Sequence, residues 1–248
     1  MQRSKASGGV IELVKTVVIA LVIAFGIRTI AFEPFNIPSG SMEPTLLIGD
    51  YLFVSKFSYG YSTYSLPYGI HLFSGRIFGR QPQRGDVVVF KLPRDPQVDY
   101  IKRIIGLPGD RIQMKNGILN INGEPVKRER IEDFVNTESG TLTRTPQYIE
   151  TLPNGVQHPI LEMSDDGPLD NTGEYVVPPD HYFAMGDNRD NSLDSRVQGG
   201  GGVGYVPAEN LVGHAEIIFF STDGTAAWYE FWKWPSAMRF GRFFTVIR

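Results

Sequence analysis

The sequence predicts a mainly β protein, with a mixed antiparallel β domain that carries a smaller inserted cap and follows one N-terminal transmembrane helix. Two observations predict this arrangement. The chain has one long apolar stretch near its start, and after it come short β-branched and aromatic runs that Pro and Gly bound. Few later stretches show the 3.6-residue period of an amphipathic helix.

Eight runs after the apolar stretch read as strands. They cover 51–57, 86–92, 100–106, 111–115, 117–123, 174–178, 181–186 and 214–221. Asn116-Gly117 and Asn122-Gly123 are tight-turn signals beside two of them. Residues 124–173 are more polar. We therefore predict a β core over 33–123 and 174–248, with 124–173 as the inserted cap.

Composition excludes several classes of protein. The 248 residues hold no cysteine, which removes disulfides, cysteine zinc sites and a thiol nucleophile. Lys and Arg number 24 against 27 Asp and Glu, so no basic excess predicts a nucleic-acid partner. The four histidines lie apart, in no metal-binding pattern. We expect no metal, no cofactor and no small-molecule cofactor partner.

The apolar stretch 10–32 is long enough to cross a bilayer as a helix of roughly 35 Å. Lys15 and Arg28 lie within it, and long basic side chains reach the interfaces. Basic residues precede it and none follows until Lys56, which predicts that residues 1–9 are cytoplasmic and that the body lies outside. A buried core helix and a cleaved signal peptide are the alternative interpretations.

Four polar segments are candidates for chemistry. They are S-G-S-M-E-P-T-L (39–46), G-D-Y-L-F-V-S-K (49–56), Y-I-K-R-I-I-G-L-P-G-D (100–110) and G-D-N-R-D-N-S-L-D-S-R (186–196). A serine in a Gly-bounded loop can expose its hydroxyl beside oxyanion donors. Strand alternation places Lys102 on the face of Tyr100 and Ile104, and a lysine on an apolar face loses its proton more readily.

A membrane anchor followed by these four segments in this order resembles the bacterial type I signal peptidases, also called leader peptidases, a family with a serine–lysine dyad. The resemblance runs from about residue 10 to about residue 221. It implies an endopeptidase that removes signal peptides from translocated preproteins after small residues, at an A-x-A-like site, in the inner (cytoplasmic) membrane.

The resemblance also implies roles for individual residues. Ser41 is the expected nucleophile, Lys102 the general base and Ser39 an oxyanion donor. The expected positioning residues are Ser192, which hydrogen-bonds the lysine, Tyr100, which helps to bury it, and four that brace the site through ion pairs: Arg103, Asp187, Asp194 and Arg196.

Elimination from the residues favours the same chemistry, because the chain has no cysteine, no G-x-S-x-G elbow and no histidine in a candidate segment. Two alternatives stay open: a self-cleaving serine–lysine protein, and a non-catalytic anchored β domain that binds envelope partners. Aromatic residues in 57–79 and 227–244 are typical of a lipid interface, so preproteins and the bilayer are the expected partners.

Overall fold

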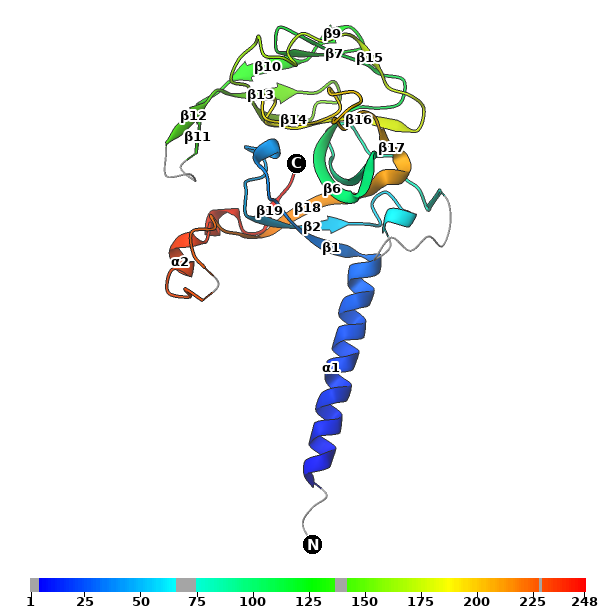
Figure 1. The fold of residues 1–248 in the computed structure, drawn as a ribbon, viewed down its shortest axis with the longest axis vertical. Helices are drawn as coiled ribbons and strands as arrows, with labels where there is room; N and C mark the ends of the chain where they lie inside the picture. The colour runs from blue at the N-terminus through cyan, green and yellow to red at the C-terminus, as the bar shows by residue number, and fades with distance from the viewer. Residues whose placement is uncertain (1–4, 66–74, 137–141, 228) are drawn as a thin grey trace.

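The computed structural model describes residues 5–65, 75–136, 142–227 and 229–248. It confirms a mainly β body behind one long N-terminal helix (Figure 1). The aromatic residue Trp228 and part of the 57–79 segment lie outside the described residues.

The long helix is α1 (Lys5–Ile30), which projects from the body in Figure 1. Its stretch Gly9–Ile30 has a mean hydropathy of 2.5, and no part of that stretch is buried against the body. By length and composition it can cross a membrane. The helix ends two residues before the end of the 10–32 stretch, because the first strand begins at Phe32.

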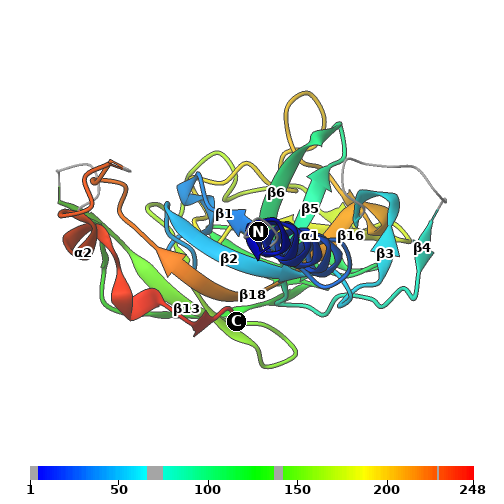
Figure 2. The same ribbon diagram turned by 90° about the horizontal axis from the view of Figure 1, so that it is seen from below.

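The main sheet has eight strands, in the order β1-β2-β18-β5-β6-β16-β17, with β19 paired to β18. Its strands are β1 (Phe32–Asn36), β2 (Asp50–Ser55), β5 (Val87–Leu92), β6 (Asp95–Gly106), β16 (His181–Met185), β17 (Val206–Pro207), β18 (Leu211–Ser221) and β19 (Thr245–Val246). All these pairings are antiparallel. Figure 2 shows β1, β2 and β18 passing beside the end of α1.

Smaller sheets complete the described part of the body. One sheet joins β15 (Tyr175–Val176), β7 (Arg111–Lys115), β8 (Ile118–Ile121) and β9 (Glu124–Pro125). A second sheet joins β10 (Lys127–Arg130), β13 (Gln147–Thr151) and β14 (Gln157–Leu161). Two separate pairs are β11 (Phe134–Asn136) with β12 (Thr143–Thr145) and β3 (Tyr61–Ser62) with β4 (Arg76–Ile77). Short helices are α2 (Trp234–Ala237) and the 3-10 turns Gly40–Met42, Thr63–Ser65, Ala208–Asn210 and Phe240–Arg242.

The two Asn-Gly turns form as the sequence predicts. Asn116 and Gly117 have φ of 48° and 69°, and Asn122 and Gly123 have φ of 56° and 90°. Asn and Gly are the residues that adopt this left-handed backbone at least cost. Strands β9 to β14 fall within 124–173, but β9 pairs with β8, so the division into core and cap stays a prediction.

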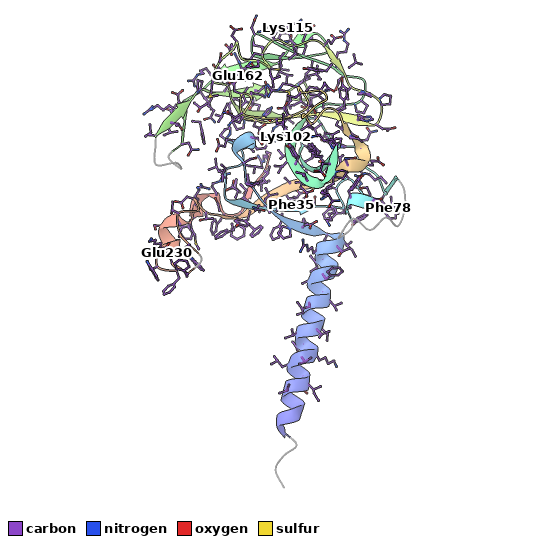
Figure 3. All side chains as sticks on the ribbon, viewed as in Figure 1. Phe35, Phe78, Lys102, Lys115, Glu162 and Glu230 are labelled. Atoms are coloured by element: carbon purple, nitrogen blue, oxygen red, sulfur yellow. The ribbon has the colours of Figure 1, made fainter. Side chains whose placement is uncertain are left out.

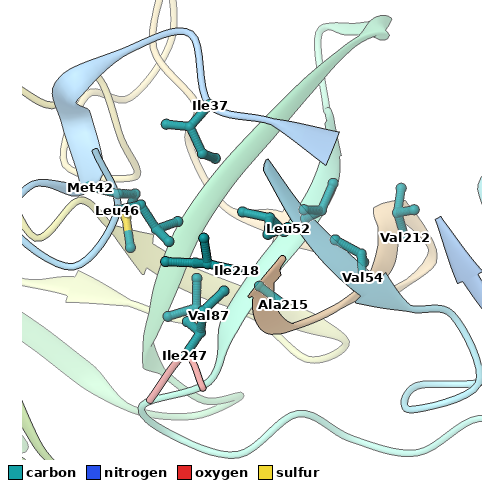
Figure 4. Close-up of a cluster of buried hydrophobic side chains, with 11 residues drawn as sticks. Ile37, Met42, Leu46, Leu52, Val54, Val87, Val212, Ala215, Ile218 and Ile247 are labelled. Carbon is teal, nitrogen blue, oxygen red and sulfur yellow. The ribbon is translucent and has the colours of Figure 1, made fainter. Parts of the chain in front are cut away.

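A buried apolar cluster fixes the loop between β1 and β2 to the main sheet (Figure 4). Met42 and Leu46, both fully buried, come from this loop and pack with Val87 and Val89 of β5 and with Ile218 of β18. Burying a side chain of this size stabilises the fold by roughly 1.5–3 kcal/mol. The loop is therefore held against β5 and its neighbour β6, although it starts at the far edge of the sheet.

Helix α1 joins the body through polar contacts at its end. Glu33 of β1 pairs with Arg28 of the helix at 3.0 Å and with the buried Lys56 at 2.8 Å. The Tyr61 hydroxyl donates to the Ile30 carbonyl at 2.7 Å. These bonds tie the end of the helix to β1 and to the segment that follows β2.

Candidate active site

Ser41 lies in the 3-10 turn Gly40–Met42, inside the loop that Met42 pins to the sheet. Its Oγ is 3.5 Å from the Ser39 Oγ. A fixed turn of this kind keeps a serine hydroxyl in one place, since its neighbour in sequence is fully buried. The two serines that the sequence predicts as nucleophile and oxyanion donor are therefore adjacent.

Lys102 of β6 reaches the same hydroxyl. Its Nζ donates to the Ser41 Oγ at 2.6 Å and to the Ile101 carbonyl at 3.0 Å. The Tyr100 ring lies two residues away on the same strand, with its centroid 5.5 Å from the Nζ. Figure 3 shows the labelled Lys102 inside the body. A serine and a lysine 61 positions apart in the chain thus share one short hydrogen bond.

Burial changes the acidity of this lysine. Lys102 is 3% exposed, and desolvation lowers its pKa to about 8, against the opposing pull of Asp194 and Asp187. A free lysine is only on the order of 0.1% neutral at pH 7.5, whereas a pKa of about 8 leaves about a quarter of the amines neutral. The neutral amine accepts a proton, so the pair can act as general base and nucleophile.

Arg103, the next residue of β6, points to the opposite face and binds Asp187 in a bidentate pair. Its Nε and Nη2 donate to the two carboxylate oxygens at 2.8 and 2.7 Å, and its Nη1 donates to the Gly85 carbonyl at 2.7 Å. Burial alone would raise the pKa of Asp187, but the Arg103 guanidinium outweighs it and holds that pKa far below its usual range. The pair stays ionised and links β6 to the loop after β16.

Asp194 and Arg196 form a second buried pair within that loop, with bonds of 3.0 and 2.9 Å. Asp194 also accepts the Gly186 N–H at 3.1 Å. A Cβ on Gly186 would stand 2.2 Å from the Ser192 Oγ and 2.4 Å from the Ser41 carbonyl oxygen. Only glycine therefore lets this loop approach the turn that carries the nucleophile.

Ser192 lies at the site, but it does not form the hydrogen bond to Lys102 that the resemblance implies. Among the described residues, the Ser192 Oγ is buried without a hydrogen-bond partner. The Lys102 Nζ donates to Ser41 and to the Ile101 carbonyl instead. The backbone carbonyl takes the place that the sequence assigned to the serine.

Asn188 contacts the turn that carries Ser41, whereas the sequence interpretation treated it only as part of a structural turn. Its N–H donates to the Ser41 carbonyl at 3.2 Å and its Nδ2 to the Gly40 carbonyl at 3.0 Å. Thr45 likewise donates its hydroxyl to Asp187 at 2.5 Å. Both residues lie inside the four polar segments of the sequence, and this position is the sequence signal that could identify them. Their hydrogen bonds join the first and last segments directly.

The sequence does not predict a further group of buried ionisable side chains that contact one another. His158 of β14 lies 3.3 Å from Glu150 and 3.4 Å from Asp187, and Arg189 binds Glu150 through two bonds of 2.9 and 2.5 Å. Glu150 and His158 lie in the more polar region of the sequence, where nothing distinguishes a buried charge from a solvated one.

Comparison with known proteins agrees with this geometry. The family described as "Signal peptidase, peptidase S26" matches residues 10–220. The signal peptidase I of Rickettsia typhi is 44% identical over 216 residues, which cover 84% of this chain and 78% of the relative. That of Rickettsia bellii is 39% identical over 249 residues, covering 93% and 83%.

A solved signal peptidase I from Enterococcus faecalis aligns at 26% identity with a TM-score of 0.32, over 54% of this chain and 97% of that one. That TM-score is too low to support a structural argument, so the sequence matches decide the assignment. The family match defines a peptidase, and its N-terminal apolar helix is long enough to cross a membrane. The chain belongs to the signal peptidase family S26, as its four segments predict.

The Arg103–Asp187 pair gives a stability prediction. We expect Asp187→Asn to lower the free energy of unfolding by about 3–5 kcal/mol, because it leaves a fully buried guanidinium without its counter-charge. Denaturant unfolding of the full chain in detergent measures this. The control Asp99→Asn removes a partly exposed partner of Lys91 and should cost less than about 1 kcal/mol. Equal losses in the two variants would contradict the role of the buried pair.

Proposed function

We propose that this chain is a membrane-anchored endopeptidase that removes N-terminal signal peptides from translocated preproteins, with Ser41 as nucleophile and Lys102 as general base. The observation that supports it most is the 2.6 Å hydrogen bond between the Lys102 Nζ and the Ser41 Oγ, made by a lysine that is 3% exposed. The family assignment supports the peptidase activity.

The reaction follows from that bond. Neutral Lys102 takes the Ser41 hydroxyl proton while the Oγ forms a bond to the scissile carbonyl carbon. The Ser39 hydroxyl and the Ser41 N–H stabilise the negative oxygen that results. The Lys102 ammonium then gives its proton to the departing amine, and the peptide bond breaks. Neutral Lys102 then takes a proton from a water whose oxygen bonds to the acyl carbon, and the Lys102 ammonium returns that proton to the Ser41 Oγ as the acyl–oxygen bond breaks.

The substrate assignment follows from the family. The Rickettsia relatives are named signal peptidase I, and we infer the same substrate class here, with cleavage after small residues in an A-x-A-like pattern. An intact Ser41–Lys102 contact is not needed by a non-catalytic anchored domain that only binds envelope partners. Cleavage of a separate A-x-A peptide in trans distinguishes the proposed enzyme from both that domain and a self-cleaving protein.

Exposed aromatic side chains support contact between the body and the bilayer. Trp232, Phe231 and Phe240 are 60–70% exposed at the C-terminal end, and Phe78 is 83% exposed on β4's side of the body. Figure 3 shows Phe78 and Glu230, the residue before Phe231, at opposite edges of the body, both on the side from which α1 leaves. Aromatic rings of this kind favour the membrane interface. We infer that this face rests on the outer surface of the inner membrane.

Ser41→Ala should lower kcat/KM for an A-x-A peptide by at least about 10⁴-fold, because no other group can form the acyl bond. Ser39→Ala should cost less, about 10²–10³-fold, as the loss of one oxyanion donor. The control Ser236→Ala changes an exposed serine and should leave the rate unchanged. Activity within tenfold of the parent in Ser41→Ala would refute the nucleophile.

The pH profile tests Lys102. The active form is the neutral amine, so kcat/KM should rise about tenfold per pH unit on the acidic limb and level off above an apparent pKa of about 8. Lys102→Met and Lys102→Arg should both be inactive, since neither offers a base near neutral pH. Lys91→Arg, on the neighbouring strand β5, is the matched control and should keep the parent profile. A limb near pH 6.5 would point to a histidine and reject the dyad.

The absence of cysteine allows a clean test of orientation. In spheroplasts of a bacterium expressing single-cysteine variants, Lys115→Cys, at an exposed position remote from α1, should react with a membrane-impermeant maleimide. Gln2→Cys should react only after permeabilisation, because the basic residues before the span keep the N-terminus inside. The reverse pattern would invert the proposed topology.

A further inference from the structure

Three carboxylates meet at a place that the proposed chemistry does not use. Glu162 directly follows β14, Asp170 lies in the loop after it, and Asp190 lies in the loop after β16. One oxygen of each lies within 4.8 Å of the others. Figure 3 shows the labelled Glu162 in the part of the body remote from α1.

Two of these side chains are buried and have carboxyl oxygens that accept no hydrogen bond. Glu162 and Asp170 are each 1% exposed. Among the described residues, neither Oε of Glu162 accepts a hydrogen bond, and neither does the Asp170 Oδ1. A buried carboxylate without a partner is costly, and like charges beside it add to that cost. Burial raises the pKa of Glu162 to about 9, against the opposing effect of Arg189, and the nearby Asp170 and Asp190 add to the rise, with Asp170 close enough to share the Glu162 proton.

The surrounding backbone holds the other two carboxylates in place. Asp190 Oδ2 accepts the Met163 N–H at 2.6 Å and the Ser164 N–H at 3.3 Å, and Asp170 Oδ2 accepts the Gly167 N–H at 2.5 Å. A Cβ on Gly167 would lie 3.0 Å from Asp170 Oδ2 and 3.1 Å from Asp190 Oδ1. The glycine therefore leaves room where the carboxylates converge, and the half-buried Asp190 opens the cluster to solvent.

Arg189, the cation that lowers the pKa of Glu162, does not bind the cluster directly. Arg189 directs both terminal nitrogens to Glu150, at 2.9 and 2.5 Å. Its Nε–H donates to no acceptor among the described residues. The terminal nitrogens of Arg189 are thus bound to Glu150 and leave the three carboxyl groups of the cluster without a bond from this guanidinium.

We propose that Glu162, Asp170 and Asp190 bind a divalent cation, Ca²⁺ by its coordination chemistry, which joins the loop after β14 to the loop that carries Asp187 and Ser192. The ligand set is all oxygen, which hard cations prefer. Oxygens on opposite sides of Ca²⁺, each 2.3–2.6 Å from it, lie roughly 4.6–5.2 Å apart, which accommodates the 4.8 Å limit of this cluster. The sequence predicts no metal because it offers no His or Cys pattern, and three distant acids form no motif.

Titration calorimetry on the full chain in detergent, after removal of metals by a chelator, tests the site with CaCl₂ and with MgCl₂. We expect saturable one-to-one Ca²⁺ binding with Kd of about 10⁻⁴–10⁻³ M, and a higher thermal midpoint in the presence of Ca²⁺. Glu162→Gln and Asp190→Asn should abolish both effects. Without cation, the thermal midpoint of Glu162→Gln should be no lower than that of the parent, because the substitution removes a buried acid from beside like charges. That result separates loss of the cation site from loss of the fold.

Asp166→Asn is the matched control, because Asp166 is an exposed acid of the same loop outside the cluster, and it should bind Ca²⁺ as the parent does. Absence of saturable binding of either cation at about 10 mM, or binding that survives both cluster variants, would overturn the site. The Glu162 carboxyl would then be protonated and donate to Asp170. Binding of Mg²⁺ alone would overturn the choice of Ca²⁺. These outcomes do not depend on peptidase activity.

Discussion

The desolvation of one lysine is the constraint on which the rest of the site depends. In the proposed mechanism Lys102 must lose a proton near neutral pH, and removal from water is the largest effect that lowers its pKa, to about 8. Lowering the pKa of this lysine from 10.5 to about 8 costs about 3 kcal/mol, which the surrounding fold must offset. The apolar cluster beneath the Ser41 turn supplies such stabilisation, because Met42 and Leu46 bury next to β5 and close the site from the side of the sheet.

The ion pairs around the site follow from the same constraint. A free carboxylate beside Lys102 would stabilise its ammonium form and undo the effect of burial. Asp187 and Asp194 are the acids that raise its pKa, and each is bound to an arginine, Arg103 and Arg196. Pairing leaves little negative charge for the lysine. The same pairs fix the loop after β16, so that Gly186 and Asn188 touch the backbone of the nucleophile turn.

Helix α1 and the turn that carries Ser41 are also directly connected. Strand β1 connects the end of α1 directly to the loop of Ser41, and Glu33 ties that strand to Arg28 and Lys56. In the proposed function, five residues of strand and a short loop connect Ser41 to the N-terminal helix, which would hold the serine near the bilayer, where signal peptides emerge. The proposed cation would bind the loop after β16, which also carries Asp187 and Ser192.

The sequence by itself determined the class of fold, the membrane span, the two Asn-Gly turns and the four segments that hold Ser41 and Lys102, because hydropathy, turn chemistry and motif order are local properties of the chain. Tertiary structure decided which groups meet. The bond of Lys102 to the Ile101 carbonyl rather than to Ser192, the Asn188 bonds to the Ser41 turn and the buried Glu150–His158 group join residues far apart in sequence or depend on backbone position. Burial also turned ordinary acids such as Glu162 into groups without partners, and no pattern of residue types along a chain specifies which charges the folded sheets will enclose.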